Sequence, residues 1–185
     1  MSSDTGGTSV VPFDWSHNPS SWSQRVPIIV LALVGTAISA YLAAFQLELI
    51  PSVWEPFFGD GSERILTSSV SNVLPIPDAA LGAMSYLADA ATGAIGGRAR
   101  WRTMPWIVVL FGLAVGPLGI VSITLVILQP VLFDAWCTLC LASAVVSLAM
   151  IGPAMDEVLA SLQWLRGVQR RGGSVWHAFW TGAER

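Results

Sequence analysis

The chain has 185 residues, of which 54% are hydrophobic and 11% are charged, and its mean hydropathy is +0.63. Soluble globular domains carry roughly 25% charged residues, so this composition excludes an ordinary soluble domain and indicates a protein of the lipid bilayer. The net charge is −3, and no basic surface of the nucleic-acid-binding kind is visible, so we expect no nucleic-acid partner.

The first predicted element is a transmembrane helix behind a polar tail. Residues 1–25 are rich in Ser, Gly and Thr and are predicted to form a flexible cytoplasmic tail, in which Asn18-Pro19 has the pattern of an N-cap and first helical residue. Residues 26–45 are uncharged and match a bilayer span of about 20 residues, longer than a signal-peptide core of about 7–15 residues. Gly35 and Ser39 have the spacing at which another helix can pack closely.

A long polar connection, residues 48–77, comes next. It contains a predicted short helix at 62–68, and loops of this length are usually functional or disordered. The second transmembrane helix is predicted at 78–97. Asp89 lies inside this helix, where an acidic side chain is expected to face the bundle or a polar end of it.

The next uncharged stretch, residues 104–133, is longer than one span requires. Gln129-Pro130 is predicted to divide it, because proline removes a backbone donor and disfavours helix in the residue before it. The third helix is therefore predicted at 104–128 and the fourth at 134–155. Three glycines are expected on the packing side of the third helix: Gly112, Gly116 and Gly119.

The C-terminal stretch 156–171 is amphipathic and is predicted either to rest on the membrane surface or to extend the fourth helix. The expected fold is all-α: an integral membrane four-helix bundle with a long external loop between helices 1 and 2 and a C-terminal amphipathic helix. The corresponding division is a tail at 1–25, a transmembrane domain at 26–153 and an interfacial segment at 154–185.

The arginines predict the orientation of the bundle. With four spans, one side of the membrane holds Arg64 alone, and the other side holds Arg25, Arg98, Arg100, Arg102, Arg166, Arg170, Arg171 and Arg185. The positive-inside rule then places both termini in the cytoplasm. The loop at 48–77 and the start of the fourth helix are expected outside, which in the inner membrane of a bacterium is the oxidising periplasm.

The only two cysteines, Cys137 and Cys140, form a Cys-x-x-Cys motif at the start of the fourth helix. Such a motif can be a redox pair, half of a zinc site or two buried thiols. A structural zinc site needs four ligands, and His17 and His177 lie far away in polar terminal segments, which argues against zinc. A redox pair is favoured, while a static disulfide or two inert thiols remain the alternatives.

The position of the pair suits redox chemistry. A helix N-terminus favours thiolate, and a spacing of three residues puts both sulfur atoms on one helix face within disulfide range. We expect Cys137 near the aqueous rim and Cys140 about one turn deeper, where a lipid-soluble quinone could reach it. Ser143 and Ser147 continue the same face with small polar groups.

Three stretches together resemble the vitamin K epoxide reductase family of quinone-coupled thiol oxidoreductases. They are the Cys137-x-x-Cys140 motif, the segment Pro77-Asp78-Ala79-Ala80-Leu81-Gly82 with Tyr86 after it, and the loop segment Ser62-Glu63-Arg64-Ile65-Leu66-Thr67-Ser68. With the order of the four helices, the resemblance covers residues 27–151.

The resemblance implies a role for each matching residue. Cys140 would reduce a quinone, either ubiquinone or menaquinone, and Cys137 would exchange disulfides with an external thioredoxin-like thiol protein. Asp78 lies where the family often has an asparagine that hydrogen-bonds a quinone carbonyl; the alternative is an N-cap for the second helix. Trp136 and Ser143, beside the cysteines, are expected to contact the quinone.

Two departures from the family pattern bear on function. Ser62 occupies the place of a loop cysteine that relays electrons in the family, and Ala144 lies where animal members have a quinone-contacting tyrosine. An external thiol protein would then have to attack Cys137 directly. The alternative is a non-catalytic quinone-binding or scaffold subunit with a structural cysteine pair; a transporter is disfavoured because no inverted repeat is visible.

Overall fold

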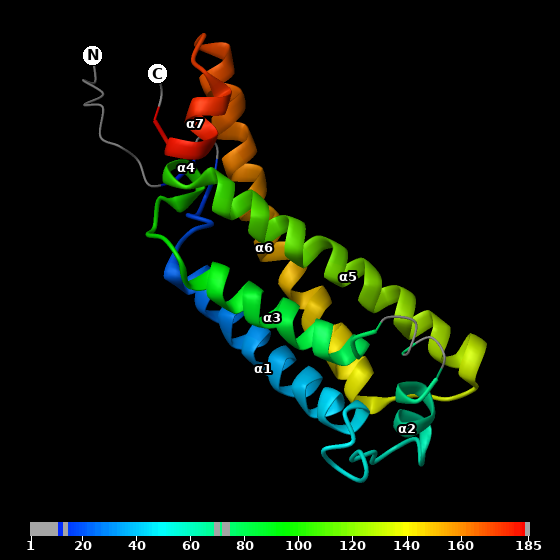
Figure 1. Cartoon of the computed structure of the whole chain (residues 1–185). Helices are drawn as coiled ribbons and strands as arrows, with labels where there is room; N and C mark the ends of the chain where they lie inside the picture. Colours follow the sequence, from blue (N-terminus) through cyan, green and yellow to red (C-terminus); the bar gives the residue numbers. More distant parts are fainter. Residues whose placement is uncertain (1–10, 13–14, 69–70, 72–74, 184–185) are drawn as a thin grey trace.

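The structure of the chain is a computed structural model that describes residues 11–12, 15–68, 71 and 75–183. Within these residues all regular secondary structure is helical. The helices are α1 (Trp22–Gln46), α2 (Gly61–Leu66), α3 (Asp78–Ala94), α4 (Arg100–Thr103), α5 (Pro105–Phe133), α6 (Thr138–Arg170) and α7 (Val175–Thr181). The long helices α1, α3, α5 and α6 form a bundle with α2 at one end and α4 and α7 at the other (Figure 1).

Three of the described helices, α1, α5 and α6, are long and apolar enough to cross a membrane. The second predicted span corresponds to α3, which has 17 residues and ends at Ala94. At 1.5 Å per residue such a helix reaches about 25 Å, short of a hydrocarbon core of about 30 Å. The expected four-helix arrangement is thus present as packed helices, of which α3 is a short one.

The predicted close approach on α1 occurs against α3, the most extensive helix pairing in the bundle. A Cβ atom added to Gly35 would lie 2.7 Å from Cε1 of Tyr86, and one added to Gly82 would lie 3.4 Å from Oγ of Ser39. Small residues at these places therefore let the two helices touch, and they leave room for the ring of Tyr86 at the centre of the hydrophobic core.

Two of the three glycines expected on the packing side of α5 face α6. A Cβ atom at Gly112 would collide with Val158, and one at Gly119 would collide with Ile151, whereas Gly116 faces open space. The expectation is confirmed for Gly112 and Gly119 and is wrong for Gly116.

The prediction that Gln129-Pro130 divides the third helix is wrong. Helix α5 runs through Pro117 and Pro130 and ends at Phe133, where Asp134 adopts a left-handed conformation with φ of 45°. Proline removes only one backbone donor, and an apolar environment strongly favours helix because no water can satisfy an open backbone. The buried side chain of Gln129 also remains in the bundle and finds a partner there.

Helix α6 has 33 residues and begins at Thr138, four residues later than predicted, because the residue before it, Cys137, is extended. It continues without a break beyond residue 155, so the stretch 156–171 extends the fourth helix. Leu165 and Val168 in this extension pack against Ala178 of α7.

The start of α1 also differs from the prediction. Oδ1 of Asn18 accepts a hydrogen bond from N of Ser20 at 3.0 Å, which forms a turn, and the helix begins at Trp22 with Ser21 in the N-cap position. Asn18 thus caps the turn before the helix, because its side chain reaches a backbone amide two residues on.

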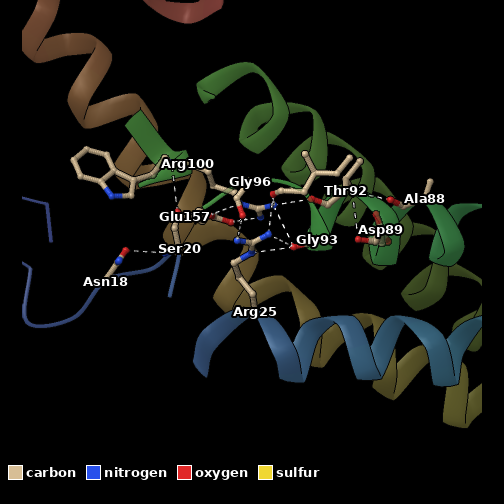
Figure 2. A network of polar contacts seen from close by, with 12 residues as sticks. Asn18, Ser20, Arg25, Ala88, Asp89, Thr92, Gly93, Gly96, Arg100 and Glu157 are labelled. Carbon is tan, nitrogen blue, oxygen red and sulfur yellow. Dashed lines mark hydrogen bonds and ion pairs between the residues drawn. The ribbon is translucent and has the colours of Figure 1, made fainter. Parts of the chain in front are cut away.

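Buried arginines close the end of the bundle at α4, opposite α2 (Figure 1), and Figure 2 shows their contacts. Arg25 donates to the carbonyl oxygens of Gly93, Gly96 and Ile95 at the C-terminal end of α3. Arg100 donates to the carbonyl oxygen of Thr92 at 2.6 Å and forms a buried ion pair with Glu157 of α6. Both arginines therefore do more than mark the orientation of the bundle, because they satisfy the carbonyl groups that a helix end leaves open.

Asp89, one turn before this helix end, is buried as expected, and neither of its carboxylate oxygens has a hydrogen-bond partner among the described residues.

Candidate active site

The Cys-x-x-Cys motif forms a disulfide. Cys137 and Cys140 are bonded to each other, with 5.2 Å between their Cα atoms, so the spacing brings the sulfur atoms together as predicted. Cys137 is the N-cap residue of α6, and its Sγ accepts a hydrogen bond from N of Cys140 at 3.1 Å. The disulfide therefore occupies the first turn of α6.

Cys137 precedes Cys140 at the end of the bundle, but it is covered and not open to water. Its side chain is 0% exposed, in a cluster with Ile65 of α2 and Ala135. Its backbone N–H donates to Oε1 of Gln129 at 3.0 Å. The short helix of the loop packs on the segment that precedes α6, and this packing covers Cys137.

Cys140, in contrast, lines a cavity of about 460 Å³ that is bounded by α1, α3, α5, α6 and Leu66 of α2. Most of the cavity wall is aliphatic. Polar side chains that contribute to the wall include Asp78, Ser85, Tyr86, Ser122, Gln129 and Ser143. A mostly apolar cavity with a few polar groups is the usual form of a site for a small organic ligand.

Asp78 and Ser143, two of the residues expected to contact a quinone, line this cavity together with Cys140. Trp136 does not: its ring packs 6.3 Å from the ring of Phe58 on the loop side of the disulfide. The structure therefore brings Asp78 and Ser143 to Cys140 and leaves Trp136 outside the cavity.

Asp78 in the cavity wall is held by Gln46, which does not itself line the cavity. Nε2 of Gln46 donates to Oδ1 of Asp78 at 2.6 Å, and Oε1 of Gln46 accepts from N of Ala79 at 3.2 Å. Asp78 is the first residue of α3 and Pro77 holds the N-cap position, so the alternative role of Asp78 as the N-cap is wrong by one residue. Gln46 was not predicted from the sequence, because its partner Asp78 is 32 residues away in the chain.

The other polar group is a hydroxyl cluster. The Tyr86 hydroxyl contacts the backbone oxygen of Ser143 at 2.7 Å and also contacts Oγ of Ser147. Oγ of Ser122 donates to Oγ of Ser147 at 3.0 Å. The helical spacing of Ser143 and Ser147 was visible in the sequence, whereas Ser122 had no signal of its own.

Glu55, in the loop before α2, was also missed. Its carboxylate accepts hydrogen bonds from N of Thr138 at 2.9 Å, from the hydroxyl groups of Thr138 and Ser62, and from N of Phe57 at 3.3 Å. Burial raises the pKa of Glu55, but the hydrogen bonds from Ser62 and Thr138 outweigh it and hold the pKa below the ordinary value of 4.5. Glu55 is therefore a carboxylate at neutral pH.

Comparison with known proteins gives the family. The family model for the Vitamin K epoxide reductase family matches residues 26–154, more than half of the chain. The chain belongs to this family. Its members are quinone-dependent thiol oxidoreductases built as membrane helical bundles, and the Cys-x-x-Cys disulfide of this chain lies within the matched region. No curated protein matches the chain.

Proposed function

We propose that this member of the Vitamin K epoxide reductase family passes electrons from an external thiol protein, through Cys137 and Cys140, to a quinone in the membrane. The observation that carries the proposal is the position of the disulfide between two environments. Cys140 lines the apolar cavity, while Cys137 lies under the loop and is not part of the cavity wall.

The exchange begins at Cys137. A thiolate of the partner attacks Sγ of Cys137, which forms a mixed disulfide and releases Cys140 as a thiolate. A second thiol of the partner then attacks the partner's own sulfur atom in the mixed disulfide, so that the partner leaves oxidised and Cys137 is released. Both cysteines are now reduced, and the pair carries two electrons.

Re-formation of the disulfide returns these electrons to the membrane. A bound quinone supplies the acceptor, since it takes up two electrons and two protons to become the quinol. The loss of two electrons and two protons from Cys137 and Cys140 restores their disulfide. Cys140 is the cysteine that would face the quinone, because it is the one that lines the cavity.

The cavity fits such a ligand. Its aliphatic walls suit a flat apolar ring, while Asp78, Tyr86 and Ser143 offer polar groups for carbonyl oxygens. Asp78 can donate a hydrogen bond to a carbonyl only if it is protonated, whereas the hydroxyl of Ser143 is a donor as it is. These residues would orient a quinone ring beside Cys140, and either ubiquinone or menaquinone is compatible with them.

The orientation in the membrane is part of the proposal. Arg64 of α2 lies at the disulfide end of the bundle, and Arg25 and Arg100 lie at the other end (Figure 1). The positive-inside rule then places both termini in the cytoplasm and the disulfide end outside, on the periplasmic side of a bacterial inner membrane.

A thiol-trapping assay tests the proposal. Native membranes are mildly reduced, and the state of the cysteines is followed after ubiquinone or menaquinone is added. We expect reoxidation of the pair with quinone and none without it, and we expect the Cys140→Ala variant to lose quinol formation down to background. Cysteines that stay in one state whatever quinone is present would refute the redox proposal.

The second candidate function is that of a non-catalytic quinone-binding or scaffold subunit. The buried position of Cys137 and the serine at position 62 favour it, because no second cysteine pair reaches the covered disulfide. Under this alternative the Cys140→Ala variant loses assembly of the larger membrane complex, measured by native electrophoresis.

A further inference from the structure

The loop that covers the disulfide is held in place by contacts with the segment around the start of α6. Four of the contacts that join the loop to the segment 133–138 are made by Glu55, Arg64 and Gly61. The Glu55 carboxylate bonds both the hydroxyl group and the backbone amide of Thr138, and Nη2 of Arg64 donates to the carbonyl oxygen of Phe133 at 2.9 Å. Gly61 lies so close to the carbonyl oxygen of Trp136 that a Cβ atom would collide with it.

Glu55 is the centre of this set because it joins three separate pieces of backbone. It bonds Ser62 at the start of α2, Phe57 in the preceding turn and Thr138 at the start of α6. Ser62 is fully buried beneath it. Loss of the carboxylate would therefore free α2 from α6 and would leave a buried hydroxyl group without its acceptor.

The carboxylate also shares a helix end with the disulfide. Thr138 is the first residue of α6, and its N–H bonds Glu55, while Sγ of Cys137 accepts the N–H of Cys140 in the same turn. The N-terminus of a helix stabilises negative charge. With Glu55 already present there, a second negative charge on a reduced Cys137 is disfavoured.

We propose that Glu55 is a positioning residue that holds α2 closed over Cys137 and disfavours the reduced state of the pair. Release of its bonds to Ser62 and Thr138 uncovers Cys137 for attack by a thiol. The part of this inference that concerns a partner protein rests on the proposed function, whereas the covering of the disulfide does not.

The Glu55→Ala and Glu55→Gln variants separate the two effects. Both remove the negative charge, but glutamine keeps an oxygen that can accept from N of Thr138. Glu63→Gln is the matched control, because Glu63 belongs to the same loop, accepts from N of Val53 at 3.3 Å and makes no contact with Thr138.

The first measurement is the rate at which dithiothreitol, and separately reduced thioredoxin, reduces the disulfide of the purified full chain in detergent without quinone. We expect Glu55→Ala to be reduced at least about tenfold faster than the wild type, with the larger effect for thioredoxin because it needs more space. The reduction rate of Glu55→Gln should lie between those of the wild type and Glu55→Ala. The rate of Glu63→Gln should match the wild type.

The second measurement is the redox equilibrium of the pair in thiol–disulfide buffers. Removal of the charge should shift the equilibrium toward the dithiol by about tenfold in both Glu55 variants, which corresponds to a reduction potential about 30 mV higher. A merely structural role of Glu55 would change the rate of reduction and leave this equilibrium at the wild-type value.

The inference is overturned if Glu55→Ala is folded and its disulfide is reduced no faster than that of Glu63→Gln. If Glu55→Ala does not fold, Ser62→Ala, which removes one of the bonds, decides instead: an increase of at least about twofold supports the inference, and an unchanged rate overturns it. Faster reduction of Glu55→Ala without any effect of quinone on reoxidation would refute the proposed function and leave the role of Glu55 standing.

Discussion

The two ends of the bundle use the same chemistry for different purposes. At the arginine end, the buried side chains of Arg25 and Arg100 bond the open carbonyl groups of α3, and Arg100 also bonds the buried carboxylate of Glu157 (Figure 2). At the disulfide end, Glu55 bonds the open amide of α6 from a half-exposed loop. Charged hydrogen bonds weaken when water can replace them, so the first end is built to stay closed and the second can open.

The largest effect on stability is expected from Glu157. Replacement by alanine leaves two buried guanidinium groups without a counter-charge, which should reduce the free energy of unfolding by about 3–5 kcal/mol. The thermal unfolding midpoint in detergent measures this loss. Arg98→Met, at an exposed arginine of the same end, should leave the midpoint nearly unchanged, and an equally small change in Glu157→Ala would contradict the contrast between the ends.

An intermediate effect is expected at the middle of the bundle. Gly35→Ala places a methyl group 2.7 Å from the ring of Tyr86, and overpacking of this kind costs about 1–3 kcal/mol. The same substitution at Gly116 meets open space and should be neutral or slightly stabilising. Unfolding midpoints of the two variants, measured side by side, test whether α1 and α3 are as closely packed as described.

The smallest effect is expected from pH at the disulfide end. Because the pKa of Glu55 is held below 4.5, its bonds contribute stability above that pH and lose it as the pH falls through the lowered pKa. The difference in unfolding midpoint between the wild type and Glu55→Gln should therefore be constant near neutral pH and disappear in acid. A difference that grows as the pH falls would show that the sign of this linkage is wrong.

Local features of the sequence predicted the helices and the disulfide. Runs of uncharged residues, the long connection at 48–77 and the spacing of Cys137 and Cys140 depend on residues close together in the chain. Gly35 and Ser39 were found for the same reason, because helix periodicity fixes which residues share a face. The family match over residues 26–154 agrees with the three stretches that suggested it.

The features that sequence analysis missed are long-range contacts. Glu55 and Thr138 are 83 residues apart, and Arg100 and Glu157 are 57 apart. No local pattern indicates which buried carboxylate meets which donor. Pro130 was misread for a related reason, since the tendency of proline to break a helix is overridden where the surroundings give the backbone no other partner.

The cavity beside Cys140 also has an open side. Two residues of its wall on α5, Val121 and Leu125, are 52% and 37% exposed, on the surface of the bundle that faces lipid if α5 spans the membrane. A hydrophobic substrate would then arrive by diffusion within the bilayer, with its chain left among the lipid tails while its head enters between the helices. Turnover should accordingly follow the mole fraction of substrate in the lipid, and adding more membrane at a fixed amount of substrate should slow it by dilution in two dimensions.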